Sequence, residues 1–197
     1  MFEIVTVPNT VLTSQTKKVE KFDGQLNRMV KDMEVALAKQ VNPQGVGLAA
    51  PQVGVDLAVF IIRPSESGKI EAFVNPEILK IETHNPQGLK KSEPANPEGL
   101  KKRKFEESRK KRKHVKLEGC LSIPKIWGTV DRAGKVLLKY RDINGKQKQK
   151  WFSGFKAIII QHEVDHLNGI LFTQRVLEQG KKLYEEEDGE LEKITSI

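Results

Sequence analysis

Hydrophobic residues at helical spacing mark two stretches of the chain. Asp23 can cap a helix that we expect to run to about Val41. The apolar face of this helix consists of Leu26, Met29, Val30, Met33 and Leu37. The second stretch contains the apolar run Ala157–Ile160, with Ser153 as its expected cap and Asn168-Gly169 as its end. This run of apolar residues indicates a helix that is buried on most of its sides.

Runs with β-forming residues and turn signals predict strands between these two helices. The expected strands are Leu57–Arg63, Ile70–Val74, Glu77–Glu82, Val136–Arg141 and Gln147–Phe152. Asn75-Pro76 predicts a turn between the second and third strands, and Asn144-Gly145 predicts a hairpin that joins the last two.

A shorter helix is expected from about Thr173, followed by an acidic tail at 185–188. Strands enclosed by helices at either end indicate an α+β fold rather than a doubly wound parallel sheet. We therefore predict antiparallel strands that surround the buried helix, with further helices near the N- and C-terminal ends of a single domain, 1–197.

Composition excludes several classes of protein. One cysteine, Cys120, rules out an internal disulfide. The longest apolar run, Leu57 to Ile62, is far too short to span a bilayer, and the first residues lack the features of a signal peptide. We expect a soluble, cytoplasmic protein with no membrane segment.

The net charge of +8 belongs to one segment of the chain. Between Thr83 and Leu117 there are twelve Lys and Arg against four Glu, so the remainder of the chain is neutral. Residues 85–114 hold most of this charge and form a basic segment. The segment holds a short repeat, seen at 85–91 and again at 96–102, and charge pairs that permit a solvated helix. It has almost no apolar face, so we expect it to be mobile.

The buried helix carries a candidate metal site. His162 and His166 are four residues apart, which places both imidazoles on one face of a helix. Glu163 would then lie beside a metal-bound water, where a carboxylate can take and return a proton. The same short pattern also arises by chance, so the remaining motifs must decide.

Three stretches together resemble the signature motifs of the peptide deformylases. They are GVGLAAPQVG (45–54), EGCLSIP (118–124) and QHEVDHLNG (161–169), and the resemblance runs from about Pro8 to Arg175. The resemblance implies a metal-dependent hydrolase that removes the N-formyl group from the formylmethionine of newly made proteins. It also implies one metal ion per chain, usually Fe2+, which Zn2+, Ni2+ or Co2+ can replace.

The resemblance assigns roles to residues of the three motifs. Cys120, His162 and His166 would bind the metal and leave one position open for water, the pattern of a catalytic site. Metal-activated hydroxide would attack the formyl carbonyl, with Glu163 as general acid and base. The Gln52 side chain and the Leu121 backbone N–H would stabilise the oxyanion.

The resemblance also implies a substrate site. The peptide would add as a strand along Val46, Gly47 and Gly119, with its methionine against Val46, Phe155, Ile158 and Ile159. Core packing is an alternative role for the two isoleucines. Glu118 and Arg132 match a family ion pair behind the metal.

Two other functions compete with this hypothesis. In a zinc peptidase the third histidine of the pattern would fall at Phe172, which cannot bind a metal. A distant ligand from Glu185–Glu187 is an alternative, but it would leave Cys120 without a role. An RNA-binding module would use the basic segment, which has a single aromatic residue, Phe105, for base stacking. For the insertion 85–114, two alternatives stay open: a solvated segment without a partner, or a tether to ribosomal RNA.

Overall fold

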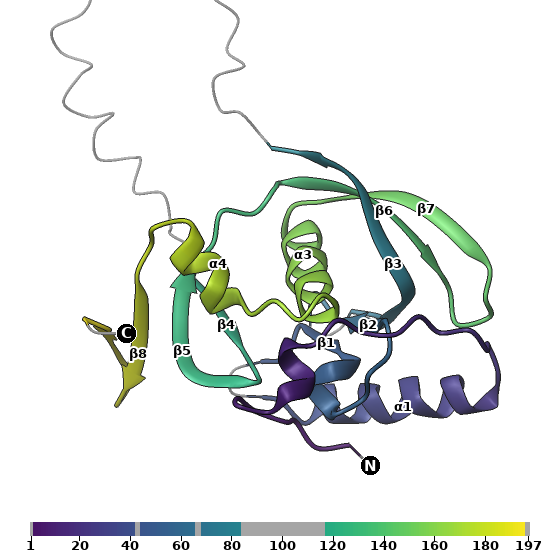
Figure 1. Ribbon diagram of the computed structural model, residues 1–197, viewed down its shortest axis with the longest axis horizontal. Helices are drawn as coiled ribbons and strands as arrows, with labels where there is room; N and C mark the ends of the chain where they lie inside the picture. Colours follow the sequence, from purple (N-terminus) through teal and green to yellow (C-terminus); the bar gives the residue numbers. More distant parts are fainter. Residues whose placement is uncertain (1, 42–43, 66–67, 84–116, 196–197) are drawn as a thin grey trace, which may run out of the picture. The chain divides into compact units, whose positions relative to one another are not determined.

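The computed structural model describes residues 2–41, 44–65, 68–83 and 117–195 (Figure 1). The insertion 85–114, with its repeat and expected helix, lies outside the described residues. The helical segments are η1 (Thr10–Thr13), α1 (Gly24–Ala38), η2 (Ala50–Val53), α3 (Phe155–Leu167) and α4 (Phe172–Glu178). None of these described helices combines the length and the apolar composition that crossing a bilayer requires.

Two antiparallel sheets accompany the helices, which confirms the predicted α+β fold. The first has the order β1-β2-β3-β6-β7, with β1 (Gly47–Ala49), β2 (Val59–Ile62), β3 (Glu71–Glu82), β6 (Lys135–Arg141) and β7 (Gln147–Ser153). The second has the order β4-β5-β8-β9, with β4 (Leu117–Cys120), β5 (Ile123–Thr129), β8 (Leu183–Glu187) and β9 (Glu190–Lys193).

Helix α1 begins where the sequence predicts. The Asp23 carboxylate accepts a hydrogen bond from the Gln25 backbone N–H at 2.8 Å. The expected apolar face is largely buried, but the helix ends at Ala38, three residues before the expected end. Val41 instead forms an isolated antiparallel bridge with Gln44. The chain thereby turns early toward the loop that precedes β1.

Helix α3 occupies the centre of the described fold, with the first sheet around it (Figure 1). Its Ala157, Ile159 and Ile160 are almost completely buried. They pack with Phe60, Phe73, Val136, Leu138 and Phe152 of the first sheet. The prediction that Ser153 caps this helix is wrong. Ser153 is the last residue of β7, and Gly154, at φ +62°, occupies the cap position without a side-chain bond.

Strand β3 is continuous where the sequence predicts a turn. Asn75 has φ +49°, and the register against the neighbouring strand shifts between Val74 and Glu77. The Asn75 side chain accepts from the Val19 N–H and donates to the Val19 carbonyl, both at 2.8 Å. A segment more than fifty residues earlier thus provides the hydrogen-bond partners of the Asn75 side chain, and the strand continues past the register shift.

The C-terminal region also differs from its prediction. The acidic residues at 185–188 belong to a β-hairpin, β8–β9, rather than to a tail. Its first strand pairs with β5, and Leu183 is buried against Val176 and Phe172 of α4. One apolar residue and the backbone pairing therefore hold the hairpin on the second sheet.

The N-terminal segment is hydrogen-bonded to the C-terminal end of α3. The Thr16 N–H and hydroxyl both donate to the Leu167 carbonyl, each at 2.9 Å. Gly169, at φ +70°, turns the chain after the helix, as Asn168-Gly169 predicts. A Cβ at Gly169 would approach the Thr13 backbone to 2.6 Å, so the two segments pack without space for a side chain.

Candidate metal centre and adjoining pocket

Three potential metal ligands meet between the second sheet and α3. Cys120 ends β4, while His162 and His166 lie one turn apart on α3. Their ligand atoms all lie within 4.8 Å of one another, and the Cys120 Sγ is 3.2 Å from the His166 Nε2. A thiolate and two imidazoles form a ligand set that suits both zinc and iron. The residues present therefore fit a single transition-metal ion.

The electrostatics of the cluster favour a thiolate. Burial disfavours the charged form of Cys120, but the adjacent His166 and His162 outweigh this effect and hold the pKa of the thiol well below its usual value. Burial likewise opposes protonation of His162, yet its contacts with Cys120 and Glu118 raise the pKa of His162 well above its usual value. The cluster thus stabilises negative sulfur, the form that binds metals.

A carboxylate orients one of the histidines. The Glu118 Oε2 lies 3.2 Å from the His162 Nδ1. Engagement of Nδ1 leaves the His162 Nε2 for a metal. The Arg132 guanidinium in turn donates to both oxygens of Glu118, at 2.9 and 3.0 Å. Burial works against the Glu118 carboxylate, but His162 and Arg132 together lower the pKa of Glu118.

Two further residues extend this charged contact. Asp165 of α3 accepts from Arg132 at 2.5 Å and from Arg175 of α4 at 2.8 Å. Arg175 also contacts Glu178 on the exposed end of the cluster. We call the residues Glu118, Arg132, Asp165 and Arg175 the charged cluster. It links the donor strand β4, the donor helix α3 and the helix α4.

Glu163 lies beside the ligands but is not one of their set. It is buried, and its Oε2 has no hydrogen-bond partner among the described residues. Burial raises the pKa of Glu163 from 4.5 to about 7. A Cβ at Gly47 would lie 2.2 Å from the Glu163 Oε1, so the glycine leaves room for the carboxylate. A buried carboxyl group with such a pKa can exchange a proton near neutral pH.

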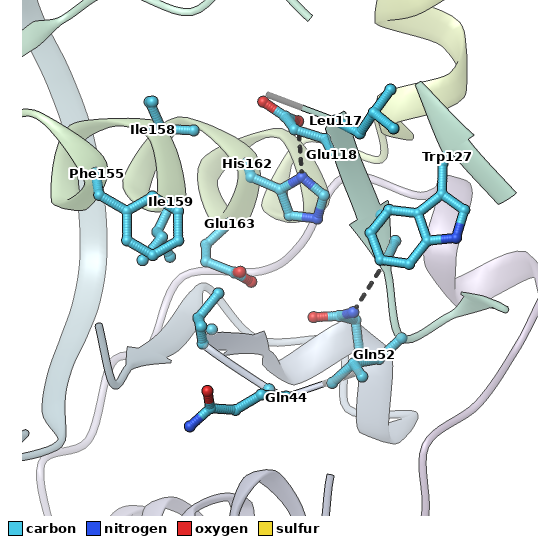
Figure 2. A pocket seen from close by; sticks show the side chains of 16 residues that line it. Gln44, Gln52, Leu117, Glu118, Trp127, Phe155, Ile158, Ile159, His162 and Glu163 are labelled. Atoms are coloured by element: carbon cyan, nitrogen blue, oxygen red, sulfur yellow. Dashed lines mark hydrogen bonds and ion pairs between the residues drawn. The ribbon is translucent and has the colours of Figure 1, made fainter. Parts of the chain in front are cut away.

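Gln52 of η2 lies close to Cys120. Its Oε1 accepts from the Ala49 N–H at 2.9 Å, which fixes the orientation of the amide. The Nε2 then points toward the Cys120 Sγ and the Ser122 Oγ, each 3.4 Å away. Figure 2 shows His162, Glu163 and Gln52 around the same space. Leu121, which follows Cys120, lines that space as well.

A pocket of about 240 Å³ opens beside this cluster. Its lining includes Val46, Gly47, Gly119, Phe155, Ile158 and Ile159. Ile159 is buried, whereas the Phe155 side chain is 45% exposed at the rim. Arg132 does not line the pocket and contacts it only through Glu118. The structure thus brings every predicted site residue either to one pocket or directly behind it.

Sequence reasoning missed several residues of this region. Leu117 and Trp127 line the pocket from the second sheet, and Gln44 lines it from the loop before β1. Asp165 lies within the histidine motif, three residues after His162, so its position on the same helix was a usable signal. Arg175 and Trp127 gave no comparable signal, because only the tertiary fold brings them near the site.

Comparison with known proteins identifies the family. Residues 1–182 match the family described as polypeptide deformylase. The chain belongs to the peptide deformylase family. It is 36% identical to peptide deformylase 1 of Bacillus cereus over 189 residues, which cover 95% of this chain and 97% of that protein. It is 37% identical to the peptide deformylase of Borreliella burgdorferi over 174 residues, covering 86% and 84% of the two chains.

Solved peptide deformylase structures have a similar fold. The enzyme from Thermotoga maritima is 31% identical, with a TM-score of 0.67, covering 89% of this chain and 97% of that chain. A class I type b peptide deformylase from Acinetobacter baumannii is 31% identical, also with a TM-score of 0.67, covering 89% and 99%. These matches confirm the family predicted from the three motifs, a family of hydrolases that remove the N-formyl group from new peptides.

Family membership also decides against the zinc peptidase. Phe172 stands where that pattern would need a third histidine, and its ring stacks on His162 with centroids 6.2 Å apart. The residue at this position therefore packs against a donor and supplies none. The described parts of the chain contain one cluster of three potential ligands, Cys120, His162 and His166.

Proposed function

We propose that this protein hydrolyses the N-formyl group of formylmethionyl peptides at the pocket beside Cys120, His162 and His166. One observation carries the proposal: three donors from two elements converge within 4.8 Å beside an apolar pocket that also contains a buried carboxyl group, Glu163. Membership of the deformylase family supports the reaction.

We propose Fe2+ as the resident ion, one per chain, held by Cys120, His162 and His166. The Cys and His donors suit iron, and they also suit Zn2+, Ni2+ and Co2+. The resemblance to a family that usually uses Fe2+ supports iron. When bound, such an ion supplies Lewis acidity and lowers the pKa of water. Glu118 would keep the His162 Nδ1 engaged, with Arg132 fixing the Glu118 carboxylate.

Glu163 would move the proton in the reaction. Its carboxylate would accept a proton from the attacking water and deliver it to the amine that leaves from the formyl group. The raised pKa of Glu163, about 7, suits both directions of transfer. Its burial, together with the apolar pocket walls, keeps other water away from the exchanged proton.

Attack on the formyl carbon places negative charge on the carbonyl oxygen. The Gln52 Nε2 and the Leu121 backbone N–H are the proposed donors to that oxygen. The Gln52 amide is held by its bond from the Ala49 N–H, so little reorganisation is needed during the reaction. Both residues line the pocket, which supports the assignment.

The substrate peptide would lie between the edges of β1 and β4. Val46, Gly47 and Gly119 offer backbone groups beside the pocket. The methionine side chain would enter among Val46, Phe155, Ile158 and Ile159, where an unbranched apolar chain fits. The two isoleucines also contribute to packing, since Ile159 belongs to the core around α3.

Formate release from formyl-Met-Ala-Ser tests the proposed function. Protein purified without oxygen should contain about one metal ion per chain and release formate at a rate proportional to that content. Cys120→Ser should bind the ion far more weakly, because an alcohol is a poor replacement for a thiolate. A Cys120→Ser protein with undiminished metal content and turnover would contradict the ligand assignment.

We propose that the enzyme acts in the cytoplasm as one domain, 1–197, with the insertion 85–114 as a tether to ribosomal RNA. The support is the charge of the segment: twelve Lys and Arg against four Glu between Thr83 and Leu117. Lys and Arg that meet phosphates release counterions, so such binding weakens steeply as salt rises. The substrates of the family emerge from ribosomes, so a tether to ribosomal RNA would hold the enzyme near its substrates.

Deletion of residues 85–114 tests the tether. The variant should turn over short formyl peptides at nearly the same rate, because the proposed ligands, Glu163 and the proposed substrate-binding residues all lie elsewhere in the chain. It should lose co-sedimentation with ribosomes at low salt. Undiminished ribosome binding would refute the tether, and the solvated insertion without a partner would then hold.

A further inference from the structure

One wall of the pocket is held in place by the C-terminal hairpin β8–β9. The hairpin begins at Leu183. Trp127 of β5 lines the pocket, and its indole Nε1 donates to the Glu186 Oε2 of β8 at 2.6 Å. Glu186 of the C-terminal hairpin thus contacts a residue of the pocket.

The indole covers the backbone that the proposed substrate strand follows. Gly119 and Trp127 are paired in register between β4 and β5. A Cβ at Gly119 would lie 2.8 Å from both Cε3 and Cζ3 of Trp127, so the ring rests directly against the glycine. Figure 2 shows Trp127 across the pocket from Phe155. We call this surface the Trp127 wall.

The hydrogen bond to Glu186 fixes the orientation of the ring. An indole has one donor and no acceptor, so rotation of the ring would lose this contact. The hairpin itself is anchored, because Leu183 is buried and its carbonyl accepts from the Ile194 N–H at 3.0 Å. Tyr184 pairs in register with Trp127, which keeps Glu186 two residues further along the same face of the sheet.

We propose that Glu186 positions Trp127 as the specificity-determining contact for a substrate residue that follows the methionine. This inference rests on the proposed function. An extended peptide along β4 directs alternate side chains to the face that carries Gly119 and Trp127. Because Gly119 has no side chain, the substrate side chain beside it reaches the indole.

The chemistry of the Trp127 wall determines which substrate side chains it binds best. An indole face attracts aromatic rings and cations, and the Glu186 carboxylate at its edge adds negative charge. Arginine and phenylalanine should therefore be preferred over glutamate at the position that meets the wall. The remaining acids of the hairpin do not share this face, since Glu185 pairs with Ile126 and Glu192 pairs with Glu185.

The experiment compares kcat/KM for two series, formyl-Met-Xaa-Ser and formyl-Met-Ala-Xaa, where Xaa is Arg, Phe or Glu. For the wild type we expect Arg and Phe to exceed Glu by about tenfold in one series. Glu186→Gln should keep the preference for Phe, because an amide oxygen still accepts from the indole, but reduce the preference for Arg by about threefold. Glu186→Leu should weaken both preferences, and Trp127→Ala should abolish both.

Glu192→Gln is the matched control. It removes the same charge from the same hairpin, but on an exposed residue of the opposite face. We expect its substrate ratios to equal those of the wild type. Equal ratios for Glu186→Leu and the wild type, or the same change in Glu192→Gln, would overturn the inference. So would flat substrate ratios in the wild type.

A binding measurement separates this inference from the proposed function. The chain has two tryptophans, so in Trp151→Phe the fluorescence comes from Trp127 alone. Saturable change on titration with formyl-Met-Ala-Phe or formyl-Met-Phe-Ser is expected even in a metal-free protein that releases no formate. Absence of turnover on every formyl peptide refutes the proposed function, whereas absence of the fluorescence change refutes the Trp127 wall.

Discussion

The two sides of helix α3, which carries two candidate metal ligands, are built from opposite kinds of residue. Behind His162 lies the charged cluster of Glu118, Arg132, Asp165 and Arg175, joined by ion pairs between 2.5 and 3.0 Å. On the pocket side the wall is mostly apolar, with Phe155, Ile158 and Ile159 from the same helix. The charged side orients a candidate metal ligand, whereas the apolar side is proposed to select the substrate.

This difference has an energetic consequence. The side chains of Arg132, Glu118 and Asp165 are only 7%, 11% and 10% exposed, so removal of one partner leaves a buried charge without compensation. Removal of a methyl group from the pocket wall loses only a small transfer energy. We therefore expect changes behind the helix to act on stability and metal binding, and changes in the pocket to act gradually on substrate choice.

Glu163 lies where the two regions meet, and its replacement should have the largest effect. Glu163→Gln should retain the metal but lose activity by about 10²- to 10⁴-fold, because an amide cannot accept and return the proton. Formate release and metal content of the same preparation check this expectation. If the variant also lost its metal, Glu163 would belong with the ligands rather than with proton transfer.

Two arginines bound to the same carboxylate test the charged cluster. Arg132→Met should lower the free energy of unfolding by about 3–5 kcal/mol, because it removes the buried guanidinium that pairs with both Glu118 and Asp165. Arg175→Met should cost about 1 kcal/mol, because the Arg175 side chain is 33% exposed and water can replace it. Urea denaturation of both metal-free variants gives the comparison. Equal losses would show that burial does not distinguish the two arginines.

The apolar side should respond through substrate choice. Formyl-Met peptides should be preferred to formyl-Asp and formyl-Lys peptides, since the pocket walls offer apolar contacts. Ile158→Ala should reduce kcat/KM for formyl-Met by about 10-fold with little change in metal content. Comparable kcat/KM values for the three wild-type substrates would refute the assignment of the pocket to methionine.

The smallest expected effect is a pH dependence that comes from Glu118. Its pKa in the folded protein is lowered from 4.5, because His162 and Arg132 outweigh the effect of burial. A lowered folded pKa contributes stability that is present above the unfolded pKa and is lost as pH falls through the folded pKa. The stability advantage of the metal-free wild type over Glu118→Gln should therefore shrink below about pH 4.5. Urea denaturation across this range measures it, and a constant difference would contradict the ionised pair.

The sequence predicts well where function depends on contiguous motifs. The spacing of His162 and His166 places both on one helical face, and Cys120 joins them in the fold. The fold class followed from strands and helices with strong local signals. The turn predicted at Asn75-Pro76 is wrong, because β3 continues past Asn75, whose side chain bonds to distant Val19. The cap predicted at Ser153 is wrong, because Gly154 occupies the cap position of α3.

The residues that sequence analysis missed depend on contacts between distant segments. Trp127 reaches the pocket because β5 pairs with β4 at Gly119, and Glu186 reaches Trp127 because β8 pairs with β5. The acidic run at 185–188 reads locally as a solvated tail, yet Leu183 anchors a hairpin there. Local composition carries no information on such pairings, which the second sheet establishes.

The bond between Thr16 and Leu167 has a consequence for the order of folding. The Leu167 carbonyl belongs to the residue next to His166, and its partner lies 151 positions earlier in the chain. During synthesis the N-terminal segment must therefore wait until nearly the whole polypeptide has left the ribosome before it closes this turn. Contacts of such separation slow folding. The turn beside His166 is therefore completed only after residue 167 has been made, by a segment from the other end of the chain.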